Sequence, residues 1–271
     1  MNLVNGVECD AISADDRGLA YGDGVFRTFT LRAGKPVLWR LHYAKLAADC
    51  GALRIACPAA AAFERDLSLL AAPHPDCVVK IIVTRGSGPR GYAIPAAASP
   101  RRIVSAAPLP DYPRSYCDLG VRVCVCRTQL AEQPALAGVK HLNRLENVLA
   151  RAEWSDPGIA EGLMCGADGN VIGGTMSNLF LVKGGALLTP DLTRCGVAGV
   201  TRSLVIESAR ANGIPLRIAA LGMAEVMAAD ELFLVNSVAG VWPVAALDGN
   251  TWLSGPLTAR VRGWLSDAQK H

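Results

Sequence analysis

The first third of the chain alternates apolar and polar residues in a strand-like way. Val25 to Leu31 alternate in a strand-like way, and Val78 to Thr84, apolar apart from Lys80 and Thr84, are typical of a buried strand. Asn5-Gly6, directly after Leu3 and Val4, is a hairpin signal. The pattern predicts strands at residues 3–4, 25–31, 36–39, 78–84, 102–106, 121–126, 162–165, 178–182, 186–189 and 231–235.

Other segments carry helical spacing. From Leu41 to Leu53 the apolar positions include residues 44, 46 and 48, which allows an amphipathic helix. A helix from Gly199 has a clear stop at Asn212-Gly213. We expect helices at 41–53, 59–70, 143–154, 199–211 and 257–268.

Strands and helices are therefore mixed along the chain, which indicates an α/β (α+β) fold. The Pro-rich stretch from Pro108 to Pro113 is the best candidate linker. We predict an N-terminal α/β domain at 1–108, a linker at 109–117 and a C-terminal α/β domain at 118–271 that carries the candidate lysine discussed below. Clefts between such halves are favoured places for cofactors.

Composition and charge exclude several classes of protein. Hydrophobic residues make up 51% of the chain, yet no stretch approaches the roughly 20 uncharged residues that a membrane span needs. The N-terminus lacks the basic flank and apolar run of a signal peptide, so we expect a soluble protein with no membrane partner. A net charge of +3 is too small and dispersed to favour nucleic-acid binding, although an anionic small molecule remains compatible with it.

The pattern of the nine cysteines predicts neither a disulfide framework nor a zinc site. Their count is odd, their spacing is irregular, and no Cys-x-x-Cys pair occurs. With four histidines and none paired at ligand spacing, we expect no metal site. Buried thiols in a reducing cytoplasm are the natural interpretation.

Lys140 is the most informative single residue. It lies in the apolar segment from Leu136 to Leu142, which we expect to be a strand end, where a lysine must either extend to solvent or serve a function. A desolvated lysine has a pKa below about 10.4, which makes its free amine a usable nucleophile toward an aldehyde. The residues alone leave both readings open.

The surrounding string, GVKHLNRLE from Gly138 to Glu146, closely resembles the lysine motif of the aminodeoxychorismate lyases, a group of fold-type IV pyridoxal-phosphate enzymes. Further blocks occur in the order and spacing of that family. They read DRGLAYGDGVF at 16–26, RGSGPRGY at 85–92, GTMSNLF at 174–180, GVAGVTR at 196–202 and, more weakly, NSV at 236–238 before WPV at 242–244. One block is weak evidence, whereas five in order are strong.

The resemblance implies a two-domain fold-type IV architecture with pyridoxal 5'-phosphate in the cleft between the domains, and a homodimer. Lys140 would hold the cofactor. The cofactor phosphate would meet the N–H groups of Val200 and Thr201 and the Ser237 side chain, with Asn236 in the same turn as Ser237 and Asn178 shaping the site. Without the other blocks, these glycines and asparagines would read as ordinary turn residues.

Two positions depart from the family pattern. An arginine usually contacts the phosphate where this chain has Lys45, which keeps the charge but loses the bidentate fork. An exposed helix lysine is the alternative interpretation of Lys45. At Gly173 the family normally has a glutamate that pairs with the pyridine nitrogen, and a glycine supplies no carboxylate.

The implied reaction converts 4-amino-4-deoxychorismate to 4-aminobenzoate and pyruvate, a step toward folate. Arg27 and Arg90 are candidates for the two substrate carboxylates, although both also read as surface arginines. The nearest rival is a D-amino-acid or branched-chain aminotransferase on the same fold. A catalytically weakened paralogue that binds the cofactor or only dimerises is the third hypothesis, and Gly173 and Lys45 keep it open.

Overall fold

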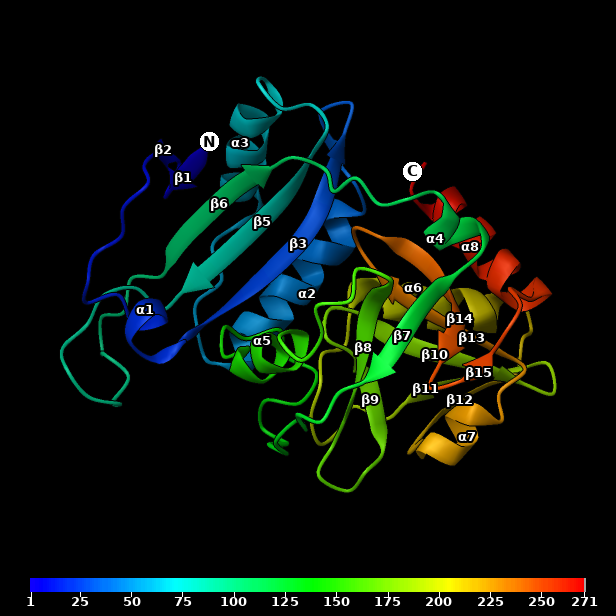
Figure 1. The fold of residues 1–271 in the computed structure, drawn as a ribbon. Coiled ribbons are helices and arrows are strands. Elements are labelled where there is room, and N and C mark those ends of the chain that lie inside the picture. The colour runs from blue at the N-terminus through cyan, green and yellow to red at the C-terminus, as the bar shows by residue number, and fades with distance from the viewer. Residues whose placement is uncertain (271) are drawn as a thin grey trace. The chain divides into compact units, whose positions relative to one another are not determined.

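The computed structural model describes residues 1–270, which divide into two compact units (Figure 1). Unit 1 comprises Met1–Pro110 and Val139–Asn143, and unit 2 comprises Asp111–Gly138 and the chain from Arg144 onward. The short segment Val139–Asn143, which carries Lys140 and is called the return segment below, therefore belongs to unit 1 and not to the C-terminal part of the chain. The domain limits expected from the sequence, 1–108 and 118–271, stay a proposal.

Unit 1 contains an antiparallel sheet with the strand order β2-β1-β6-β5-β3-β4. Its central pair is in register from Gly24 opposite Thr84 to Leu31 opposite Cys77. The strands expected at 25–31, 78–84 and 102–106 are confirmed within one or two residues. The bounds are β1 Asn2–Val4, β2 Val7–Glu8, β3 Gly24–Arg32, β4 Lys35–Pro36, β5 Cys77–Thr84 and β6 Arg101–Ala107.

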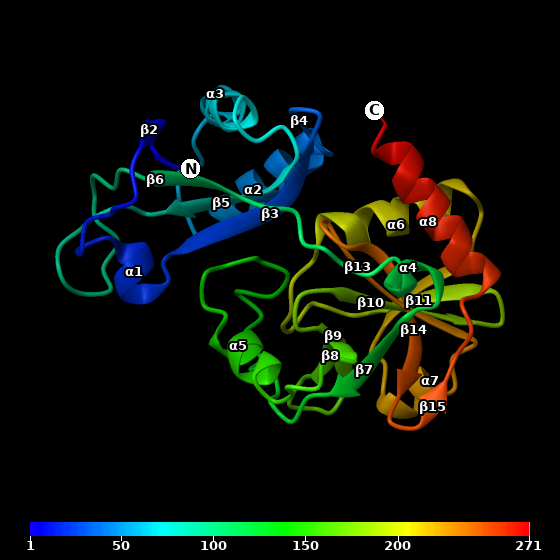
Figure 2. The same ribbon diagram turned by 45° about the horizontal axis from the view of Figure 1, so that its top comes forward.

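Helices of unit 1 are α1 Arg17–Tyr21, α2 Trp39–Ala52 and α3 Ala60–Ala71. Buried residues of α2 and α3 share one apolar core with β3 and β5, so both helices pack on the same face of the sheet (Figure 2). The strand expected at 36–39 is mostly wrong, because β4 ends at Pro36. Leu38 adopts a left-handed φ of 55°, which ends the extended chain, and Trp39 opens α2 with its ring on Phe29 and Phe63.

Unit 2 contains a mixed sheet with the order β12-β11-β10-β13-β14-β7-β8-β9, and β15 pairs with β14. The pairs β11–β12, β14–β7 and β7–β8 are parallel. The bounds are β7 Val121–Val125, β8 Ile159–Cys165, β9 Val171–Gly174, β10 Asn178–Lys183, β11 Ala186–Pro190, β12 Leu216–Ala219, β13 Glu231–Asn236, β14 Gly240–Leu247 and β15 Asn250–Thr251.

Helices of unit 2 are α4 Ser115–Asp118, α5 Leu145–Arg151, α6 Val200–Ala211, α7 Met223–Met227 and α8 Pro256–Ala268. Alternate residues of β10 and β13 point to two cores, and α6 and α8 cover the core that contains the stacked rings of Phe180 and Phe233. The helix expected at 143–154 is too long at both ends. Arg144 precedes the helix as its N-cap residue. Trp154 lies three residues beyond the helix end and packs in the same small core as Ala150 of the helix.

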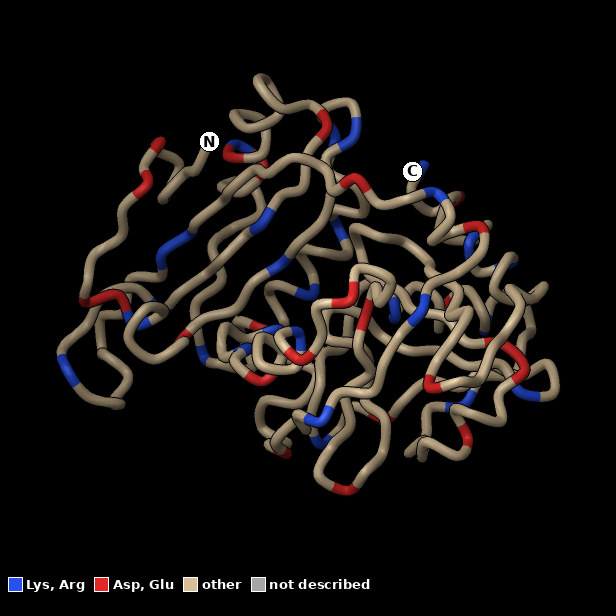
Figure 3. The backbone as a smooth tube through the Cα atoms, in the orientation of Figure 1, with Lys and Arg blue, Asp and Glu red and all other residues tan. Residues whose placement is uncertain are grey.

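Charged residues are interspersed along both units (Figure 3). Within residues 1–270, no helix combines the length and the apolar character that a membrane crossing requires.

Candidate functional site

Lys140 is fixed against β3 by backbone hydrogen bonds. The Phe26 N–H donates to the Lys140 carbonyl at 2.9 Å, and the Leu142 N–H donates to the Gly24 carbonyl at 3.0 Å. The Lys140 ammonium nitrogen lies 4.5 Å from the centroid of the Phe26 ring. The segment around Lys140 is thus not part of a β-strand, so the strand end expected from the sequence is wrong. It is a short extended return held to the edge of β3 by these bonds and a bridge between Val25 and His141.

The carboxylate of Asp49 gathers the charged residues around this lysine. Asp49 lies in α2 with its side chain 2% exposed, and it forms ion pairs with Arg27 from β3 and with Lys45 one helical turn earlier. Its Oδ2 also accepts the backbone N–H of Lys140 at 3.2 Å. Unit 1 therefore brings three residues singled out in the sequence, Arg27, Lys45 and Lys140, to one carboxylate that the sequence did not single out.

Burial sets the protonation of the groups beside Asp49. It lowers the pKa of His42 to about 3, with the positive charges of Arg27 and Lys140 adding to the effect, so this ring is neutral and stacks on Phe29 at 4.8 Å. Burial also lowers the pKa of Arg27 to about 10. Among residues 1–270, neither the Arg27 Nε nor the His42 Nδ1 has a hydrogen-bond partner, although both are buried. The cluster is cationic and rich in donors, which suits an anionic ligand.

Lys45 is partly buried, with 23% of its side chain exposed. Burial, reinforced by the charge of Arg27, lowers the pKa of Lys45 to about 8, while the carboxylate of Asp49 favours the charged amine. This setting differs from the solvated helix lysine that was the alternative. Arg27 is 2% exposed and its guanidinium is bonded to Asp49, so its assignment to a substrate carboxylate stays a prediction.

If Lys45 contacts the cofactor phosphate as predicted, the Lys45→Ala variant should bind pyridoxal phosphate more weakly by about 1.5–3 kcal/mol, because the charge-assisted contact would be lost. Lys45→Arg keeps the cation and has a much higher pKa. The affinity of the unmodified protein should therefore fall relative to Lys45→Arg as the pH rises through about 8, where Lys45 loses its proton. Absorbance titrations of the three proteins from pH 6.5 to 9.5 measure this. If the affinities of the unmodified protein and of Lys45→Arg change with pH in the same way, Lys45 does not contact the phosphate and its role is structural.

The loop before α6 in unit 2 has the form of an anion cradle. Gly199 caps the helix with extended backbone, and Gly196 has a left-handed φ of 85°. Asn178 ties the loop together, since its Nδ2 donates to the Val197 carbonyl at 2.8 Å and its Oδ1 accepts the Gly199 N–H at 3.1 Å. A Cβ at position 199 would stand 2.5 Å from that Oδ1, so a side chain there would displace the Asn178 amide that ties the loop.

Thr201 and Ser237 complete this cradle. Their hydroxyl oxygens lie 3.0 Å apart, which joins the first turn of α6 to the turn after β13. In that turn the Asn236 Oδ1 accepts the N–H groups of Val238 at 2.9 Å and Ala239 at 2.7 Å. The first N–H groups of a helix have no acceptor within the helix and carry its positive dipole end. The chain thus offers hydroxyls and helix N–H groups that fit a phosphate, and in unit 1 an amine that fits an aldehyde.

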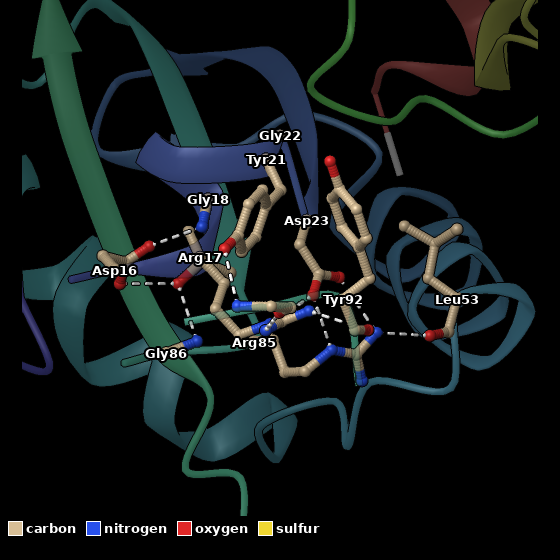
Figure 4. Close-up of polar contacts among 12 residues, drawn as sticks. Asp16, Arg17, Gly18, Tyr21, Gly22, Asp23, Leu53, Arg85, Gly86 and Tyr92 are labelled. Carbon is tan, nitrogen blue, oxygen red and sulfur yellow. Dashed lines mark hydrogen bonds and ion pairs between the residues drawn. The ribbon is translucent and has the colours of Figure 1, made fainter. Parts of the chain in front are cut away.

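The loop at 85–92 is anchored by a buried network (Figure 4). Arg85 makes a bidentate pair with Asp23 at 2.8 and 2.9 Å, and Arg17 donates to the same carboxylate at 2.9 Å. Burial acts to raise the pKa of Asp23, but the hydrogen bonds from Arg85 and Arg17 outweigh it, and the pKa lies below its ordinary value. Arg17 also donates to the Gly91 carbonyl at 2.8 Å. Arg90, within this anchored loop, is exposed.

Gly173 lies in β9 opposite Met164 of β8. Its φ is outside the left-handed region, so the backbone itself would tolerate a side chain. A Cβ would nevertheless stand 2.9 Å from the backbone carbonyl oxygen of Ser177, which has to move before a glutamate fits. The structure thus gives a local packing reason for glycine at this position.

Glu161 is a buried carboxylate on the neighbouring strand β8 that sequence reasoning missed. It accepts from the Thr175 N–H at 3.0 Å, the Thr175 hydroxyl at 2.5 Å, the Met176 N–H at 3.1 Å and the Ser177 hydroxyl at 2.8 Å. Its oxygens are thus engaged by the 175–177 turn, and its role is to hold that turn. The sequence carries no signal for it, since a single glutamate in a strand predicts nothing by itself.

The comparisons with known proteins agree with this geometry. Residues 24–247 match the model of the family described as Amino-transferase class IV. The chain belongs to this family.

The chain is 34% identical to an aminodeoxychorismate lyase of Vibrio harveyi, over 98% of this chain and 100% of that protein. A crystal structure of 4-amino-4-deoxychorismate lyase from Pseudomonas aeruginosa is 53% identical, covers 98% of both chains and superposes with a TM-score of 0.95. A D-alanine aminotransferase of Bacillus licheniformis is 28% identical over 98% of this chain and 94% of that protein. The two-unit α/β architecture is that of fold-type IV enzymes.

Proposed function

We propose that this protein is a pyridoxal-phosphate-dependent lyase that converts 4-amino-4-deoxychorismate to 4-aminobenzoate and pyruvate. The observation that carries the proposal is the full-length similarity to proteins named for this activity, at 34% and 53% identity. The class IV family consists of pyridoxal-phosphate enzymes, and the lysine and the anion cradle described above fit that cofactor.

The residues of this chain have distinct tasks in this proposal. Lys140 would hold the cofactor through its aldehyde, and its free amine would take a proton from the substrate ring and give it to the leaving enolpyruvyl group, which becomes pyruvate. Bound pyridoxal phosphate supplies an electron-accepting ring. Val200, Thr201 and Ser237 bind the phosphate, Asn178 and Asn236 hold their turns, and Lys45 adds a positive charge. Gly138, two residues before Lys140 in the sequence, pairs with the 196–198 loop that leads into α6.

An aminotransferase is the second candidate, because D-alanine aminotransferases share the fold and the family. Transamination stores charge on the cofactor ring, which a carboxylate at the pyridine nitrogen assists. The matching position is Gly173, and the carboxylate of Glu161 is engaged by the 175–177 turn. In the lyase reaction the formation of an aromatic ring supplies the driving force, so Gly173 favours the lyase.

Two assays on one purified preparation separate the candidates. The protein with added pyridoxal phosphate is given aminodeoxychorismate, and separately D-alanine or a branched-chain amino acid with 2-oxoglutarate. Formation of 4-aminobenzoate in the first assay supports the lyase, and transamination in the second supports the rival. Cofactor absorbance without either product would identify a weakened paralogue.

We infer further that the protein is a cytoplasmic homodimer. Helix α5 presents Leu145, Val148 and Leu149 on one face at 60–76% exposure, which supports contact with a second copy. The nine cysteines are free thiols, as a reducing compartment would keep them. Sedimentation equilibrium should give twice the chain mass of 28.4 kDa, whereas a monomer mass would contradict the dimer.

A further inference from the structure

Asp49 occupies an unusual place in unit 1, because three positively charged residues depend on its single carboxylate. Arg27 reaches it from β3, Lys45 from one turn earlier in α2, and Lys140 through its backbone N–H at 3.2 Å. These contacts join two secondary-structure elements and the return segment. Each partner was singled out for its own chemistry, whereas nothing in the sequence pattern singled out Asp49.

The electrostatics of the cluster show why the carboxylate is needed. Asp49 is 2% exposed and Arg27 is 2% exposed, so each ion is removed from water and depends on the other. Breaking a buried pair by removing one partner leaves an uncompensated charge, which is far more costly than losing a surface pair. The neutral ring of His42, which lies on the same helix as Asp49 and stacks on Phe29 of β3, provides no counter-charge. Asp49 is thus the negative centre on which the positions of Arg27 and Lys45 depend.

We propose that Asp49 is the positioning residue of this site: its carboxylate fixes the Lys45 ammonium and the Lys140 backbone so that both groups meet the cofactor. The inference rests on the proposed function, since it takes pyridoxal phosphate as the ligand of both lysines. Asp49 itself does not contact the reacting atoms. It sets the direction of the side chain at residue 45, the position of the peptide at residue 140 and the electric field at both amines.

A second buried ion pair in the same unit offers a matched control. Asp66 of α3 is 1% exposed and pairs with Arg102 of β6, away from the residues that surround Lys140. Asp66→Asn removes the same charge from a carboxylate that is buried to the same extent as that of Asp49. Loss of stability is common to both substitutions, so only effects seen at Asp49 and absent at Asp66 report positioning.

The test uses Asp49→Asn and, because a buried amide beside Arg27 can fail to fold, also Asp49→Ser, whose smaller side chain fits the same space. Two quantities are measured on the holoenzyme: the dissociation constant of pyridoxal phosphate, and the pH midpoint of the absorbance change of the lysine-bound cofactor. A negative charge near a cation raises its pKa, so loss of the charge should lower that midpoint by about one pH unit. The dissociation constant should rise about tenfold.

A double-mutant cycle with Lys45→Ala separates the two contacts. If Asp49 acts through Lys45, the effect of Asp49→Asn on the dissociation constant should be much smaller in the Lys45→Ala background. A pH midpoint and a dissociation constant that match those of Asp66→Asn would overturn the inference. If the unmodified protein binds no pyridoxal phosphate, the proposed function fails instead, so the two failures are distinguishable.

Discussion

The Lys140→Ala variant is expected to release pyruvate from aminodeoxychorismate about a thousandfold more slowly than the unmodified protein, or not at all, because it loses both the covalent attachment of the cofactor and the proton-transferring amine. Borohydride reduction followed by peptide mapping should place the cofactor on Lys140 of the unmodified protein. The variant should carry no label.

Lys80 provides the matched control for this experiment. Its ammonium nitrogen also lies over the Phe26 ring, at 5.3 Å from the centroid, but it belongs to β5 and is exposed. Lys80→Ala should leave the rate and the label unchanged. A cofactor label on any lysine other than Lys140, or full activity in Lys140→Ala, would remove the basis of the assignment.

The second large effect concerns Gly173. The unmodified protein should transaminate at least about a hundredfold more slowly than it cleaves aminodeoxychorismate, because no carboxylate at position 173 keeps the pyridine nitrogen protonated. Gly173→Glu should raise the transamination rate. It should also lower the melting temperature, since the new Cβ lies 2.9 Å from the Ser177 carbonyl oxygen and the turn has to shift.

The measurement compares both activities in both proteins at saturating cofactor. Gly173→Ala serves as the control, because it introduces the same Cβ without a carboxylate and should lower stability without raising transamination. Strong transamination by the unmodified protein would show that another group already protonates the pyridine, and this account of Gly173 would be wrong.

Local sequence was sufficient to predict most of the fold. The apolar alternation of 25–31 and the strand predicted at 78–84 correspond to β3 and β5, and the glycine-punctuated start and Asn212-Gly213 stop delimit α6. The failures occurred where tertiary contacts override local pattern. Residues 36–39 look strand-like, but Trp39 packs onto Phe29 and Phe63 and begins α2 instead.

The candidate site was likewise predicted only where its residues are close together in the sequence. The string around Lys140 and the loop before α6 are continuous in sequence, so both were found. The contacts that connect Asp49 and Glu161 to the site are to residues further along the chain: Asp49 accepts the Lys140 N–H across 91 positions, and Glu161 accepts the Thr175 hydroxyl across 14. No local pattern marks such partners. The spacing of Lys45 and Asp49 at i and i+4 was visible, yet it reads equally well as an ordinary helix pair.

The assignment as a lyase is tested most directly by the stoichiometry of product release. With pyridoxal phosphate and aminodeoxychorismate, the protein should form 4-aminobenzoate and pyruvate in equal amounts, without any added oxo acid. Consumption of the substrate amine with no pyruvate, or a requirement for an oxo-acid acceptor, would contradict the lyase assignment and identify an aminotransferase.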